Sequence, residues 1–332
     1  MSRLLLQGQT CVLPVVIGEQ IKCSMNTTEF LINILIFPGF LFLMVLALGL
    51  NWLDRKLIAR FQGRVGPPWY QPWADLLKLL AKEDILPTGT NVVFTSLLPL
   101  LSFASVMTAL FYIPIAFRRV ASFQGDFIVI MFLLSVPSLL YFLAGWATRG
   151  VYSIIGGNRS LLQYFSYEVL FLLAISGTII SSNSWSIEGI RQAQSEQGAF
   201  ILPQIFGFLL ALSGLIGKLK RGPLDIPKAN SEVIAGPLTE FSGKKLALWI
   251  LTNELQSIAG LSLLIYCYFG NLWQMNKLSG FLIFSVLLIL MQCLLSAISA
   301  MYARLRIDQL IRLNWYFLIP LSLLHNLYLI IK

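Results

Sequence analysis

Ionisable side chains that could carry protons or ions gather in one polar segment of this sequence, Lys218–Lys245, between two strongly apolar runs. Its acids are Asp225, Glu232 and Glu240, and its cations are Lys218, Lys220, Arg221, Lys228, Lys244 and Lys245. Ionisable groups next to hydrocarbon are costly, and they mark ion pathways and proton relays. This segment is therefore the first candidate site.

Two further acids, Glu168 and Glu254, lie inside apolar runs. Burial favours the protonated form of a carboxyl group, whereas a nearby cation favours the ionised form. An acid close to Arg159, Lys228 or Lys244 could therefore alternate between the two forms and relay a proton. The alternative is a neutral, hydrogen-bonded carboxyl group with a structural role only.

The composition indicates which elements must position these residues. Of 332 residues, 57% are hydrophobic and only 12% are charged, with a mean hydropathy of +0.77. Soluble domains contain about 25% charged residues, and a helix that crosses a bilayer needs about 20 apolar residues. Runs of this kind occur at Phe30–Trp52, Val92–Phe117, Phe127–Ala147, Leu161–Ile180, Phe200–Gly217, Leu246–Phe269, Phe281–Ala303 and Leu313–Ile331. We predict an all-α integral membrane protein with eight transmembrane helices in a single domain, residues 30–332.

Basic residues are distributed unevenly between the two sides of this predicted bundle. When the loops are assigned alternately to the two sides, 17 of the 24 Lys and Arg residues fall on one side and 7 on the other. Cytoplasmic loops carry the excess of Lys and Arg, so both termini are predicted to be extracytoplasmic, with residues 1–29 as a tail. We expect a multi-pass protein of the cell's inner (plasma) membrane. This distribution of the net charge of +9 argues against nucleic acid as a partner.

The segment after the first apolar run is also rich in cations, at Arg55, Lys56, Arg60 and Arg64. Together with Lys218, Lys220 and Arg221 they are predicted to form a basic docking surface for an acidic partner on the cytoplasmic side. A collar of cations that extend toward the lipid headgroups is the alternative.

An amphipathic helix is predicted from Pro72 onward. One side carries Trp73, Leu76, Leu77 and Leu80, and the other carries Asp75, Lys78 and Lys82. Glu83 lies at its end, and Pro87 stops it. Such a helix can lie in the plane of the headgroups, so we expect it at the membrane interface.

The sequence offers few ligands for a redox centre of its own. Its four cysteines form no Cys-x-x-Cys pair, and His325 is the single histidine. The sequence also has no glycine-rich motif for cradling phosphates. We therefore expect no cofactor to be bound by this chain, and any redox centre to belong to a partner.

Three ordered stretches resemble a known family. They read RVGPPWYQPWADLLKLLAKEDILP from Arg64, GWATRGVYSIIGGNRSLLQYFSYEV from Gly145 and RGPLDIPKANSEVIAGPLTEFSG from Arg221. They are similar to the complex I membrane subunit known as the H subunit or subunit 1, whose helix count matches the eight runs. Within that superfamily, Lys218 and the wording GPPWYQP and AGPLTEFSG are closer to the membrane-bound, energy-converting hydrogenase branch.

This resemblance implies a connector subunit that does not catalyse a reaction alone. Its partners would be cytoplasmic redox subunits with iron–sulfur or nickel–iron centres, antiporter-like membrane subunits, and a quinone at the subunit interface. The acids that match the family's polar path for protons or sodium ions are Glu83, Glu168, Asp225, Glu232 and Glu240, and we add Glu254 for its position in an apolar run. A secondary transporter, which would show inverted repeats, and a purely structural anchor are the alternatives.

Overall fold

The computed structural model describes residues 14–17, 20–23, 35–36, 39–115, 123–270 and 277–331. Two short strands, β1 (Pro14–Ile17) and β2 (Gln20–Cys23), pair antiparallel. The rest of the predicted N-terminal tail, the start of the first apolar run and Lys332 lie outside the described residues.

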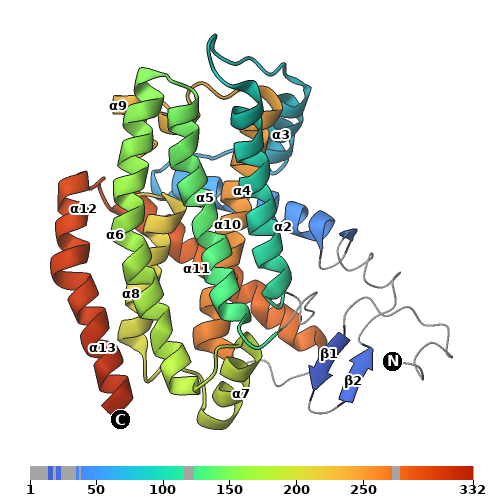
Figure 1. Ribbon diagram of the computed structural model, residues 1–332, viewed down its shortest axis with the longest axis vertical. Coiled ribbons are helices and arrows are strands. Elements are labelled where there is room, and N and C mark those ends of the chain that lie inside the picture. The colour runs from blue at the N-terminus through green and yellow to red at the C-terminus, as the bar shows by residue number, and fades with distance from the viewer. Residues whose placement is uncertain are drawn as a thin grey trace.

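Helices make up most of the remaining described chain (Figure 1). They are α2 (Phe40–Phe61), α3 (Gln71–Ala81), α4 (Val92–Tyr112), α5 (Asp126–Ala147), α6 (Val151–Ser182), α7 (Ile187–Gln197), α8 (Ile205–Leu219), α9 (Asn230–Val233), η2 (Gly236–Leu238), α10 (Gly243–Phe269), α11 (Lys277–Met301), α12 (Ile307–Leu313), the π-helical turn η4 (Asn314–Leu318) and α13 (Ile319–Ile331).

Six helical stretches in the described chain are long and apolar enough to cross a membrane: α4, α5, α6, α10, α11 and the continuous stretch from α12 to α13. The prediction of an all-helical membrane protein is confirmed at this level. The other two apolar runs correspond to α2 and α8. Helix α8 has only 15 residues, and the second half of α2 carries charged side chains. The count of eight therefore stays a prediction.

Helix α10 forms the interior of the bundle. Its apolar window is 78% buried, whereas only 22% of the window in the last stretch, Ile307–Ile331, is buried. That last stretch lies along one edge of the molecule (Figure 1). Glu254, a charged group within α10, is therefore largely surrounded by protein and needs a partner within the chain.

Glycines bring α8 directly against α6. A Cβ atom on Gly214 would come within 3.0 Å of Phe171, and one on Gly217 within 2.8 Å of the Cβ of Tyr167. Small residues allow helix backbones in membranes to approach closely. Lys218, the residue after Gly217, is thereby placed next to Glu168, the residue after Tyr167.

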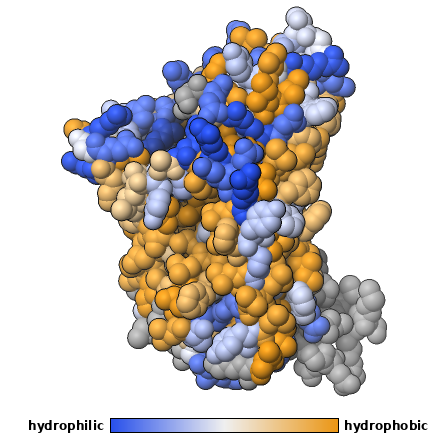
Figure 2. All heavy atoms as spheres, turned by 90° about the vertical axis from the view of Figure 1, so that its left-hand side faces the viewer, coloured by the Kyte–Doolittle hydropathy of each residue, from blue (hydrophilic) through white to orange (hydrophobic). Residues whose placement is uncertain are grey.

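The surface divides into a polar end and an apolar band. Figure 2 shows hydrophilic residues gathered at the upper end of the visible face and hydrophobic residues covering the region below it. Helices α3 and α9 lie at this upper end, and α7 lies at the opposite end (Figure 1). The segments predicted to face one common side of the membrane are thus at one end of the molecule.

Helix α2 extends further than its apolar run predicts. The run ends at Trp52, but the helix continues to Phe61, and the chain then turns at Gly63, whose φ of +72° favours glycine. Arg55, Lys56 and Arg60 therefore lie on a helix. The end of the apolar run indicates where contact with hydrocarbon would end. It does not indicate where the helix ends, because the helix continues with charged residues.

A helix also forms where the amphipathic pattern predicts it, at α3. Asp75 is bonded to Arg55 of α2 at 2.9 Å, while Leu77 and Leu80 are exposed. The side of α3 that faces α2 is thus partly polar, and its exposed side is partly apolar. Its position at a membrane interface stays a prediction.

Candidate functional site

A deeply buried ion pair joins Glu168 of α6 to Lys218 of α8. The Lys218 ammonium group lies 2.8 and 3.0 Å from the two Glu168 carboxylate oxygens, and the side chains are 1% and 8% exposed for Lys218 and Glu168 respectively. The ammonium group also lies 4.9 Å from the centre of the Phe171 ring. Close packing at Gly217 thus allows a charged pair to exist inside the bundle.

This pair corrects one prediction made from the sequence. Lys218 cannot belong to an exposed docking surface, because its side chain is enclosed and bonded to Glu168. Arg159, one of the cations considered as a partner for an acid, pairs with Glu232. Glu168 and Lys218 are 50 positions apart in the sequence, and only the contact between α6 and α8 brings them together.

A second charged cluster joins helices α2, α10 and α11 to the segment after α8. Arg221 lies 3.1 Å from Asp54 of α2 and 3.6 Å from Glu254 of α10. Asp54 also accepts hydrogen bonds from Gln292, at 2.9 Å, and from Ser296, at 2.6 Å, both on α11. Arg221 therefore contacts acids of its own chain, and this removes most of its predicted availability for docking.

Two further pairs lie nearer the polar end. Asp225 lies 3.6 Å from Arg304, and Glu232 is bonded to Arg159 of α6. Burial raises the pKa of Asp225 above its ordinary value, although Lys228 and Arg304 partly oppose the rise. The hydrogen bond and charge of Arg159 lower the pKa of Glu232.

Lys228 connects these pairs to the inner cluster. It interacts electrostatically with Asp225 and with Glu254. Arg304 in turn interacts electrostatically with Glu232. Acids and cations therefore alternate from the exposed carboxylate of Glu232 inward. We refer to Glu232, Arg304, Asp225, Lys228, Glu254, Arg221 and Asp54 as the charge series. A series of this kind can transfer protons, or change the pairing of its charges, when a charge at one end changes.

Glu83 and Glu240 lie away from the charge series. The segment that contains Glu83 is fixed to the start of α10, because Asp84 accepts a 2.7 Å bond from the backbone N–H of Lys244. The carboxylate of Glu240 packs against Gly150, where a Cβ atom would come within 2.7 Å of its Oε1. No ion pair among the described residues joins Glu83 or Glu240 to the series. Their place on a path stays a prediction.

The predicted docking cations fall into two groups. Arg60 and Arg64 are exposed, Arg55 pairs with Asp75, and Lys56 lies 4.8 Å from the centre of the Trp52 ring. Lys220 is only 5% exposed, so its predicted docking role is wrong, as it is for Lys218. Docking by the exposed members stays a prediction.

Several residues of the charged clusters were missed from the sequence: Asp54, Arg304, Gln292 and Ser296. Gln292 offered a signal, because an amide inside the apolar run Phe281–Ala303 needs a polar partner. Asp54 lies two residues after the end of the first run, next to the cations Arg55 and Lys56, and no role of its own was predicted for it.

The chain is similar to known membrane subunits of respiratory complexes. Residues 32–330 match the family described as NADH dehydrogenase. The H subunit of the NADH-quinone oxidoreductase of Dehalococcoides mccartyi is 36% identical over 307 residues, which cover 89% of this chain and 86% of the relative. A second such relative, from Syntrophobacter fumaroxidans, is 33% identical over 301 residues, covering 85% of this chain and 90% of the relative.

A solved structure shows the same fold. A chain of the membrane-bound sulfane sulfur reductase, an archaeal respiratory membrane complex, superimposes with a TM-score of 0.81 at 24% identity, over 91% of this chain and 98% of that one. At this identity the likeness is evidence for the fold alone. Together with the relatives, the recognition made from the three sequence stretches is confirmed. The chain therefore belongs to the NADH dehydrogenase family, that of the complex I membrane subunit 1, and it is a membrane subunit of a complex-I-like respiratory complex.

Proposed function

We propose that this subunit couples electron transfer in a peripheral redox module to the movement of protons or sodium ions, and that the charge series carries the coupling. One observation supports this most directly. The series leads from Glu232, an exposed carboxylate, to Glu254 and Asp54 inside the bundle, and it alternates in sign along the way. A structural anchor needs no such series, and the relatives offer no support for a transporter.

The finer arrangement is part of the same proposal. The eight apolar runs cross the membrane with both termini outside the cytoplasm, which follows from the distribution of Lys and Arg. The peripheral redox subunits, which hold the iron–sulfur or nickel–iron centres, dock at the polar end where α3 and α9 lie (Figure 1). Antiporter-like subunits continue the path within the membrane.

A quinone is the ligand that this interface would suit best. A cavity of about 370 Å³ lies between α2, α3 and α10. Leu48, Leu76 and Leu79 supply apolar walls, and Arg55 and Lys78 supply donors for a carbonyl oxygen. Apolar walls with a few polar groups are typical of small-molecule sites. When bound, the quinone would accept electrons, and the residues of this chain would hold and orient it.

The test measures ion-gradient formation in vesicles that contain the assembled complex, with assembly followed by native gel. Glu254→Gln is the most informative single change. It removes one titratable group, while Arg221 keeps Asp54 as a partner 3.1 Å away. Asp225→Asn removes the next acid along the series. Complexes that contain either variant are expected to accept electrons as the wild type does and to form only a small ion gradient.

Glu168 needs a double variant, because Glu168→Gln alone would leave the Lys218 ammonium group buried without its acid. Glu168→Gln combined with Lys218→Met removes both charges together. The control is Glu196→Gln on α7, an exposed acid at the opposite end of the bundle. Assembled Glu254→Gln and Asp225→Asn complexes that form a normal gradient would contradict the proposed path.

A further inference from the structure

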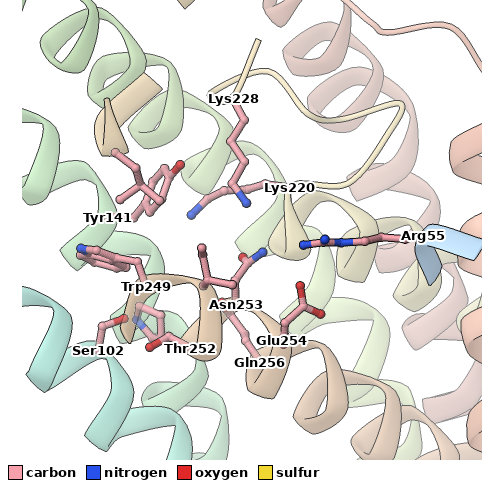
Figure 3. A pocket seen from close by; sticks show the side chains of 13 residues that line it. Arg55, Ser102, Tyr141, Lys220, Lys228, Trp249, Thr252, Asn253, Glu254 and Gln256 are labelled. Carbon is pink, nitrogen blue, oxygen red and sulfur yellow. The ribbon is translucent and has the colours of Figure 1, made fainter. Parts of the chain in front are cut away.

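A second cavity lies deeper in the protein, next to the charge series. Its volume is about 190 Å³, well above the roughly 30 Å³ that one water molecule takes up in the liquid. Residues from α2, α4, α5 and α10 line it together with the segment after α8 (Figure 3). We call it the lysine cavity, because Lys220 and Lys228 both reach into it.

The two lysines approach the same space from different directions. Figure 3 shows both side chains directed into the cavity, with the Tyr141 ring beside them. The ammonium group of Lys220 lies 3.7 Å from the centre of that ring. The charge of Lys228 acts against that of Lys220, so the cavity favours the charged form of Lys220 only if a negative charge lies nearby.

Lys220 has no acidic partner in the part of the chain that the structure describes. Among the described residues, no carboxylate lies within ion-pair distance of its ammonium group. The other charges that line the cavity are engaged, since Arg55 pairs with Asp75, Glu254 pairs with Arg221, and Lys228 interacts with Asp225 and Glu254. The lining therefore has a cation that these described acids do not neutralise.

Uncharged donors in the same lining are also unsatisfied. The Tyr141 hydroxyl, the Trp249 indole N–H and the Ser102 hydroxyl are buried, and none has a hydrogen-bond partner among the described residues. Buried donors without partners are rare in proteins, and each calls for an explanation such as an ion or water. Here the indole can only donate and the hydroxyls can donate, which favours a ligand that accepts hydrogen bonds.

We propose that the lysine cavity binds a small inorganic anion, held by Lys220 and Lys228 and by the hydroxyl of Tyr141. An anion at this place would oppose the repulsion between the two ammonium groups and would accept bonds from the free donors. Burial lowers the pKa of Lys220 well below its ordinary value, and Lys228 adds to that effect. A bound anion would favour the charged form of both lysines. The site shares Lys228 with the charge series, but binding of an anion does not require that the series carries ions.

Chloride is the probe for this proposal. Binding of ³⁶Cl⁻ to the purified, assembled complex in nanodiscs should show one saturable site that is lost in Lys220→Met. Tyr141→Phe removes only a hydroxyl group without a partner among the described residues, so this variant should assemble normally. Its chloride affinity should fall about tenfold, since a hydrogen bond to a charged group contributes enough for a change of that size.

The matched control is Lys245→Met, which changes the same residue type in the same polar segment but does not line the cavity. It should bind chloride as the wild type does. If Lys220→Met fails to assemble, Tyr141→Phe decides the question. The proposal is overturned if the variants that assemble bind chloride with wild-type stoichiometry and affinity, or if the wild-type complex binds none. Water would then be the occupant of the cavity.

Discussion

Helix α6 carries two ion pairs that differ in their surroundings. Glu168 pairs with Lys218 inside the bundle, where the two side chains are 8% and 1% exposed. Arg159 pairs with Glu232 nearer the polar end, where they are 29% and 52% exposed. Water solvates the second pair and is nearly excluded from the first. A carboxylate paired with a cation therefore supports the structure where water is excluded. Where water reaches the pair, it responds to pH and salt.

The largest effect is expected from separating the buried pair. Lys218→Met leaves the Glu168 carboxylate buried without its cation, which costs about 3–5 kcal/mol when a buried pair is broken on one side. We expect loss of assembly on a native gel, or a large drop in the melting temperature. The double variant Glu168→Gln with Lys218→Met should recover most of the loss. A single variant as stable as the wild type would show that the pair is not structural.

The next effect concerns cations that form no ion pair with the described residues. Arg60 and Arg64 are exposed at the end of α2 and beyond it, and Lys56 lies over the Trp52 ring. Reversing all three to Glu should detach the peripheral redox module in a pull-down, while the membrane part stays assembled. Single reversals should do little, because an exposed pair contributes about 0–1 kcal/mol. Full recovery of the module with the triple variant would exclude the docking role.

The apolar pattern predicted the helices well, because long apolar runs have few other stable arrangements in a membrane. It predicted the partners of the charged residues poorly. The contact between Glu168 and Lys218 depends on the close approach of α6 and α8 at Gly217. Nothing in the local sequence around either residue specifies which helix will lie opposite.

The same limit explains the misplaced lysines. Lys218, Lys220 and Arg221 form a dense basic patch in the sequence, which is typical of a solvated loop. The structure places the first against Glu168, the second in the lysine cavity and the third between Asp54 and Glu254. The density of charge in a sequence indicates only that the residues are costly to place next to hydrocarbon. Tertiary contacts decide whether these residues lie on the surface or in the interior.

A smaller effect is expected at Asp225, where burial raises the pKa of the carboxyl group. An acid whose folded-state pKa is raised stabilises the fold below its unfolded pKa, and this stability is lost as pH rises through the folded pKa. Asp225→Asn avoids that loss, so the variant should melt at a higher temperature than the wild type at pH 7. The difference should shrink toward pH 4, as seen by thermal unfolding of the purified complex. A variant that is less stable at pH 7 would show that the ionised carboxylate is favoured.

The smallest effect, with the opposite sign, is expected at Glu232. Arg159 lowers the pKa of this carboxyl group through a hydrogen bond and its charge. A lowered pKa means stability that is present above the unfolded value and lost as pH falls through the folded value. Glu232→Gln should therefore melt slightly below the wild type at pH 7, and the difference should disappear under acid conditions. Because the pair is solvent-exposed, added salt should also reduce the difference. If Glu232→Gln destabilised the complex as strongly as Lys218→Met, the contrast between the exposed pair and the buried pair of α6 would be wrong.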